Sequence, residues 1–154
     1  MKTPVIKKSL QLTRWLPALL LCLLALSAVS FCADTAEDKQ AEAEAAEAAQ
    51  HWLSLVDSGQ YATSWDEAAP IFQYSVTKPD WEKMMHKERE PLGKVLSRTQ
   101  KSALYTTTLP GAPEGKYVVL RFETSYENQK SAIETVTPSQ GSDGKWRVGG
   151  YFIE

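Results

Sequence analysis

Cysteine is almost missing from this sequence of 154 residues. Its two cysteines, Cys22 and Cys32, stand near the N-terminus, and none follows them. The chain beyond them therefore contains no internal disulfide, no thiolate metal site and no thiol nucleophile. About 120 residues can bury enough apolar surface to fold without such crosslinks, so the length fits one ordinary domain.

Several motifs that carry chemistry are missing too. The sequence has no His-Glu-x-x-His pair, no Gly-x-Ser-x-Gly turn and no glycine-rich phosphate loop. Its two histidines, His51 and His86, fall on helical segments away from the apolar positions, which is typical of solvated side chains. We therefore expect neither a metal ion nor a cofactor.

A basic stripe of the kind that binds phosphates is also lacking. Residues 34–67 hold nine acidic residues and one basic residue, while residues 78–101 mix seven basic with four acidic ones. Nucleic-acid binding needs basic residues gathered on one face, so nucleic acid is not an expected partner.

The first 33 residues differ from the remainder. They hold four basic residues and no acidic one, and residues 15–33 are uncharged and rich in leucine. A basic start, an apolar stretch and small residues at 28–30 predict a secretory signal peptide cleaved near Ser30. The alternatives are an uncleaved membrane anchor and lipidation at Cys32, although the bulky Phe31 disfavours lipidation. All three predict export to the periplasm or beyond, or anchoring in the inner membrane with the domain outside the cytoplasm.

Residues 34–154 carry 13 basic and 19 acidic residues, a formal charge of −6. Residues 34–44 are rich in Ala and Glu and have no large apolar residue, which predicts a helical or flexible linker. Residues 45–154 then form a single domain. Only the N-terminal segment is expected to contact the membrane.

Three helical segments are expected before four strands. Apolar residues recur at helical spacing up to Asp57, over about 60–74, and from the predicted N-cap Thr77 to about residue 92. Alternation then predicts strands at about 95–109, 116–126, 131–139 and 145–153. Short connections favour an antiparallel meander with helices packed on one face, an α+β fold.

Several separated segments resemble the bacterial domain-of-unknown-function family numbered 4019. They include WLSLVDSGQYATSWDEAAPIF at 52–72, LPGAPEGKYVVLRFET at 109–124 and DGKWRVGGYFI at 143–153. The resemblance covers roughly residues 45–154. That family looks like a branch of the nuclear-transport-factor-2-like superfamily, which implies a curved sheet wrapped around a helix as a cone. The cone is expected to be abbreviated, because no strand is predicted between the second and third helices.

Glu88 is the candidate catalytic residue. It stands seven residues after Trp81, which places it on the apolar face of the third helix with Met85. A buried carboxylate must be paired or protonated, and Arg89, Arg98 or Arg121 are available partners. The alternatives are a structural ion pair between helix and sheet, a side chain that reaches solvent at the helix end, and a proton-transfer or ligand-orienting group inside a pocket.

A second set of residues is a candidate for ligand binding. Arg121 and Glu134 stand on neighbouring predicted strands and would orient a ligand if their sheet face is concave. The face with Val118, Leu120 and Phe122 is the better candidate for the core, which favours an exterior position for these charges. The candidate ligand-binding residues are Trp65, Arg98, Tyr105, Arg121 and Glu134.

Three functions are compatible with these features. The first is a non-catalytic module of the cell envelope that binds a small apolar ligand or an envelope protein. The second is a small enzyme of the isomerase or dehydratase type with a carboxylate base in the cone. The third is a structural domain that forms a homodimer through its sheet. The first two rest on the fold resemblance, which is an analogy and does not assign a site.

Overall fold

The computed structural model describes residues 35–154. The predictions of a signal peptide, an anchor or a lipidated Cys32 lie outside the described residues. The elements, in chain order, are α1 (Ala36–Asp57), α2 (Tyr61–Glu67), α3 (Pro70–Ser75), α4 (Lys78–Glu88), the 3-10 turn η1 (Glu90–Leu92), β1 (Val95–Thr106), β2 (Tyr117–Tyr126), β3 (Ala132–Gln140) and β4 (Trp146–Ile153).

Helix α1 begins with a capping box. The Thr35 hydroxyl accepts from the Asp38 amide at 3.1 Å, and the Asp38 carboxylate accepts from the Thr35 amide at 2.9 Å. The segment at 34–44 that was predicted as a linker is therefore helical from Ala36 onward. Its small side chains let the helix lie close to the sheet, and Ala45 and Ala49 have no exposed surface.

The structure has four α-helices where three were expected. The predicted helix at 60–74 divides into α2 and α3, because Ala68 and Ala69 are extended and Pro70 opens the second piece. Proline lacks the amide that a continuous helix needs, but it fits a first helical position. The predicted N-cap of α4 is confirmed: Thr77 accepts from the Asp80 amide.

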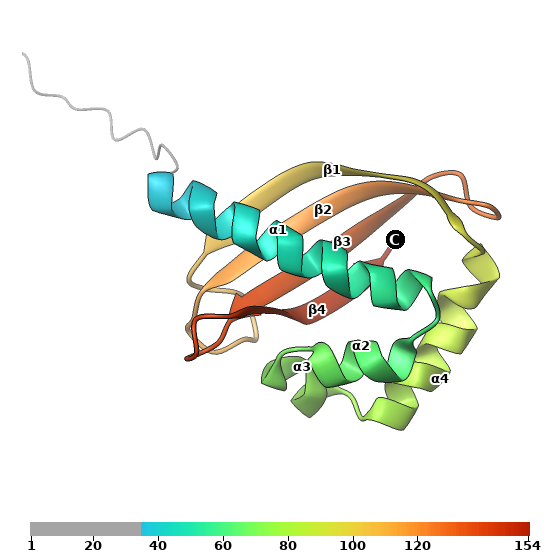
Figure 1. The fold of residues 1–154 in the computed structure, drawn as a ribbon, viewed down its shortest axis with the longest axis horizontal. Coiled ribbons are helices and arrows are strands. Elements are labelled where there is room, and N and C mark those ends of the chain that lie inside the picture. The colour runs from blue at the N-terminus through green and yellow to red at the C-terminus, as the bar shows by residue number, and fades with distance from the viewer. Residues whose placement is uncertain (1–34) are drawn as a thin grey trace, which may run out of the picture. The chain divides into compact units, whose positions relative to one another are not determined.

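The four strands form one antiparallel sheet in the order β1-β2-β3-β4, as the short connections predicted. Figure 1 shows α1 lying along this sheet, with α2, α3 and α4 gathered beside its C-terminal half. The α+β class and the four-stranded antiparallel meander are confirmed.

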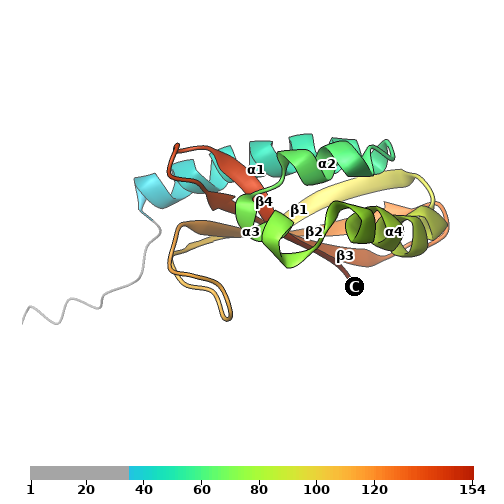
Figure 2. The same cartoon turned by 90° about the horizontal axis from the view of Figure 1, so that it is seen from below.

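Helix α1 and the sheet form two layers, which Figure 2 shows from the side. Aromatic rings fill the space beneath the helices: the ring centroids of Trp52 and Tyr151 are 5.3 Å apart, and those of Phe72 and Trp81 are 4.9 Å apart. Val118, Leu120 and Phe122 face this core, as the alternation predicted. Burial of aromatic rings at such distances supplies much of a small domain's stability.

No helix formed by residues 35–154 lies over the other face of the sheet (Figure 2). Leu104 on β1 and Phe152 on β4 lie on this face and are 57% and 66% exposed. Within residues 35–154, no helix is long and apolar enough to cross a membrane.

Candidate functional site

Glu134 of β3 is a carboxylate with no exposed surface. Its two oxygens accept four hydrogen bonds: Arg98 Nε donates at 2.5 Å and Arg98 Nη2 at 3.1 Å, while the hydroxyls of Thr124 and Tyr151 each donate at 2.6 Å. Two of the predicted ligand-binding residues, Arg98 and Glu134, are thus brought together as a buried pair. The residues that donate to Glu134 stand on β1, β2 and β4, so these hydrogen bonds link all four strands.

The Arg98 guanidinium also reaches the helices. It donates to both Asp57 oxygens at 2.6 and 3.0 Å, and Asp57 accepts a further bond from Arg89 at 3.1 Å. Asp57 is the last residue of α1 and Arg89 follows the last residue of α4. We call the residues joined by these bonds the Glu134 network: Asp57, Arg89, Arg98, Thr124, Glu134 and Tyr151.

The electrostatics of this network keep Glu134 ionised. Burial alone would raise the pKa of Glu134, but the charge and hydrogen bonds of Arg98, with the bonds from the two hydroxyls, lower it below its ordinary value. Burial raises the pKa of the Tyr151 hydroxyl well above its usual range, so that hydroxyl keeps its proton. A fully enclosed carboxylate with a lowered pKa and all its bonds formed cannot take a proton from a substrate.

The predicted position of Glu88 is wrong. Its side chain is 57% exposed and its carboxylate accepts from Lys87 at 2.7 Å. The buried side of α4 runs through Trp81, Met85 and Arg89. Helical spacing of four residues places Arg89 on the buried side with Trp81 and Met85, and leaves Glu88 at the exposed edge of that side.

The predicted ligand-binding set is divided among different places. Arg121 is exposed on the open face of the sheet, whereas Glu134 pairs with Phe122 and shares its buried face. The Trp65 indole donates to the Val76 carbonyl at 2.8 Å and packs among the helices. Arg98 also lines a shallow hollow beside the end of α1, and Tyr105 lines a separate surface groove.

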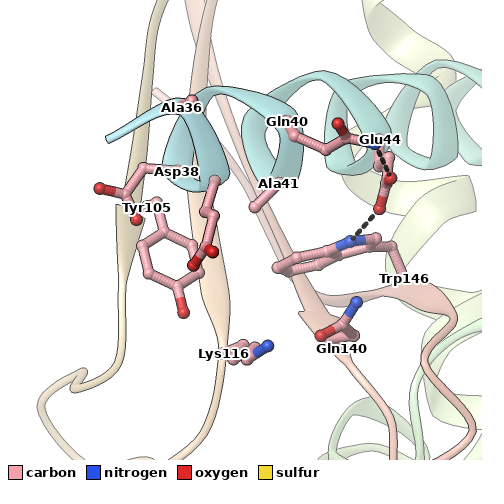
Figure 3. Close-up of a pocket in the computed structure, with 10 residues that line it drawn as sticks. Ala36, Asp38, Gln40, Ala41, Glu44, Tyr105, Lys116, Gln140 and Trp146 are labelled. Carbon is pink, nitrogen blue, oxygen red and sulfur yellow. Dashed lines mark hydrogen bonds between the residues drawn. The ribbon is translucent and has the colours of Figure 1, made fainter. Parts of the chain in front are cut away.

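This groove lies between the first turns of α1 and the nearby ends of the strands, and has a volume of about 420 Å³. Figure 3 shows the Tyr105 and Trp146 rings on opposite sides of the hollow, with Lys116 and Gln140 on the side away from α1. We call this hollow the α1 groove. Its size falls within the range of small-ligand sites.

Hydrogen bonds hold the walls of the α1 groove in place. The Trp146 indole donates to Glu44 at 3.3 Å, and Gln40 donates to the other Glu44 oxygen at 2.8 Å (Figure 3). The Tyr105 backbone amide donates to Glu42 at 3.2 Å, which ties β1 to α1. The Trp146 ring and the Tyr105 backbone are therefore tied to α1.

The charge of the α1 groove is mainly negative. Three carboxylates, those of Glu37, Asp38 and Glu44, line it together with one ammonium group, that of Lys116. The Asp38 carboxylate serves the capping box, and the Glu44 carboxylate has only neutral donors as partners. The lining thus leaves a net charge of −2 without compensation inside the groove.

Sequence reasoning missed most of this groove. No local pattern pairs Glu44 with Trp146, because 102 residues separate the two partners. Glu134 had a detectable signal, since Ala132, Glu134 and Val136 alternate as one strand face. An acidic residue inside such an apolar face indicates a buried ion pair. Among residues 35–154, no group of three acidic or histidine side chains could hold a metal ion.

A model of a protein family described as protein of unknown function (DUF4019) matches residues 48–151. No curated protein and no solved structure matches the chain. The matched range includes the end of α1, the three shorter helices and nearly all of the sheet. Because this range covers well over half of the sequence, the chain belongs to the DUF4019 family.

Proposed function

We propose that this chain is an exported, non-catalytic binding module that holds a small ligand in the α1 groove. The observation that carries the proposal is the pair of rings, Tyr105 and Trp146, which lie on opposite sides of a hollow of about 420 Å³. Ligand sites commonly combine apolar or aromatic walls with a few fixed polar groups. The Glu44, Lys116 and Gln140 side chains supply such groups here.

The hydrogen bonds around the groove favour binding over chemistry. The Trp146 indole is held by its bond to Glu44 of α1, so little freedom of this side chain would be lost when a ligand enters. An enzyme of the isomerase type would need an accessible carboxylate base. The predicted base, Glu88, is exposed on α4 and lines neither this groove nor the Glu134 network.

Binding can be tested with three probes that share a phenylethyl body: phenethylamine, 2-phenylethanol and 3-phenylpropionate. Binding in the groove should shift the indole N–H resonance of Trp146, which Trp146→Phe assigns. Tyr105→Ala should weaken the response, while the control Tyr74→Ala should leave it unchanged, because Tyr74 is 93% exposed and lies outside the groove. If no probe shifts the Trp146 resonance, the proposal is wrong.

Export is proposed from the leader at residues 1–33 alone. Expression of the full chain in bacteria, followed by fractionation and N-terminal sequencing, tests it. Cleavage near Ser30 and release into the periplasmic fraction support a signal peptide. A full-length chain in the membrane fraction supports the anchor, and a full-length chain in the cytoplasm contradicts export.

We further propose that the family is a branch of the nuclear-transport-factor-2-like superfamily. Helices packed on one face of an antiparallel sheet support this relation. The described chain passes from α2 to α4 through α3 without a strand, so the cone would be abbreviated. A solved structure that superposes on members of that superfamily over the whole sheet would test the relation.

A homodimer through the sheet is a second candidate, and it is favoured by the exposed apolar residues of the open face. Leu104 and Phe152 would be covered in such a dimer. Sedimentation of the wild-type chain should then show a dimer, and Phe152→Asp should give a monomer. A wild-type monomer at high concentration removes this candidate.

A further inference from the structure

We propose that the ligand of the α1 groove is an organic cation, an ammonium group attached to an apolar body. This inference rests on the proposed binding function and names its ligand class. It comes from the combination of aromatic walls with uncompensated carboxylates in one hollow of suitable size.

The aromatic walls that Trp146 and Tyr105 form in the α1 groove suit a cationic ligand. The only polar hydrogen of the Trp146 ring is already directed to Glu44, so the ring meets a ligand through its π system. An ammonium group beside the face of Trp or Tyr is attracted by the negative charge above the ring. Neutral apolar groups pack on the same rings, but they gain nothing from the carboxylates.

The carboxylates of the α1 groove also favour a cationic ligand. Glu44 accepts only from the Trp146 indole and the Gln40 amide, neither of which carries a charge. Glu37 also lines the groove, and no cation within residues 35–154 bonds to it. The positive end of α1 offsets part of this negative charge, and the Asp38 cap already neutralises that end. An anionic ligand would meet Glu37 and Glu44 with Lys116 as its only favourable partner.

Substitution of Lys116 tests the inference, because the charge of this residue is opposite to that of the carboxylates in the lining. Lys116 is the single basic residue of the lining, on the side of the groove away from α1 (Figure 3). Its charge repels a bound cation, so Lys116→Met should tighten binding of a cation and weaken binding of an anion. Glu44→Gln should do the reverse while keeping an acceptor for the Trp146 indole.

The experiment compares the three phenylethyl probes by titration of the Trp146 indole resonance. Phenethylamine is expected to bind more tightly than 2-phenylethanol and 3-phenylpropionate. Glu44→Gln and Glu37→Gln should each weaken phenethylamine by about two- to fivefold, the range for exposed charge pairs, and added salt should weaken it too. Glu47→Gln is the matched control, because Glu47 is exposed on the same helix and does not line the groove.

Each outcome has one meaning. Preference for phenethylamine, weakened by Glu44→Gln and not by Glu47→Gln, supports the cation class. Equal or tighter binding of the alcohol or the carboxylate overturns the class but keeps the binding function. If none of the three probes binds, the proposed function fails together with the inference.

Discussion

Arg98 and Glu134 stand on β1 and β3, which are not neighbours, and their side chains meet over Thr124 of the strand between them. Asp57, the last residue of α1, pairs with the same guanidinium, and the Arg98 side chain is 16% exposed. A buried pair of this kind contributes to stability only when every remaining hydrogen bond is formed, and for Glu134 all are. The Glu134 network therefore fixes how α1 sits on the sheet and, through α1, the shape of the α1 groove.

Glu134→Gln is expected to destabilise the fold by about 3 kcal/mol, because Arg98 is left buried with one partner fewer. The measurement is urea unfolding followed by tryptophan fluorescence. Glu123→Gln is the matched control, since Glu123 pairs with Lys101 on the exposed face and should change the free energy of unfolding by less than about 1 kcal/mol. Equal effects of the two substitutions would contradict the structural role of Glu134.

The Glu134 carboxylate is expected to make the free energy of unfolding depend on pH. The pKa of Glu134 is lowered in the folded state, so its contribution is fully present above the ordinary carboxyl value of 4.5. It is lost as the pH falls through the lower folded value, because the unfolded chain then binds more protons. The free energy of unfolding of the wild type should therefore fall below about pH 4.5 more steeply than that of Glu134→Gln. Parallel curves for the two proteins would contradict this.

The buried Ser64 hydroxyl is expected to stabilise the packing of the helices through a hydrogen bond. This hydroxyl accepts from the Trp81 indole at 3.0 Å and has no exposed surface. Ser64→Ala leaves that indole N–H without a partner, which should cost about 1–3 kcal/mol of unfolding free energy. Ser142→Ala, at an exposed turn position, is the control and should change it by less than about 0.5 kcal/mol. A neutral Ser64→Ala would show that the indole finds another acceptor.

Substitutions at the adjacent residues Glu88 and Arg89 test which side chain is buried at the end of α4. Glu88→Gln should change the free energy of unfolding by less than about 0.5 kcal/mol, because its side chain is exposed and pairs only with Lys87. Arg89→Met should be clearly destabilising, because Arg89 is 3% exposed and bonds Asp57 and the Gly93 carbonyl. The opposite ranking would mean that Glu88, and not Arg89, is the buried residue at the end of α4.

The sequence predicted the local features of the fold well. The N-cap at Thr77 and the inward face of β2 follow from side-chain chemistry and periodicity over a few residues. The break between α2 and α3 was visible as Pro70, but the extended pair Ala68 and Ala69 before it was not.

The functional features depend on contacts between distant residues, which periodicity does not report. Arg98 and Glu134 were both selected, but their meeting depends on strand register. Glu44 and Trp146 meet because α1 crosses the start of β4, and no local pattern marks that crossing. The position of Glu88 was wrong because the buried side of α4 follows Trp81, Met85 and Arg89 at four-residue spacing, which leaves Glu88 at the exposed edge.

Titration of the full chain with phenethylamine, followed by its indole N–H resonances, tests the central claim most directly. The account predicts a saturable shift of the Trp146 resonance, with those of Trp52, Trp65 and Trp81 nearly unchanged because these three indoles donate to groups inside the helical layer. A Trp146 resonance that does not move, or one that moves together with those of Trp52, Trp65 and Trp81, would contradict ligand binding in the α1 groove.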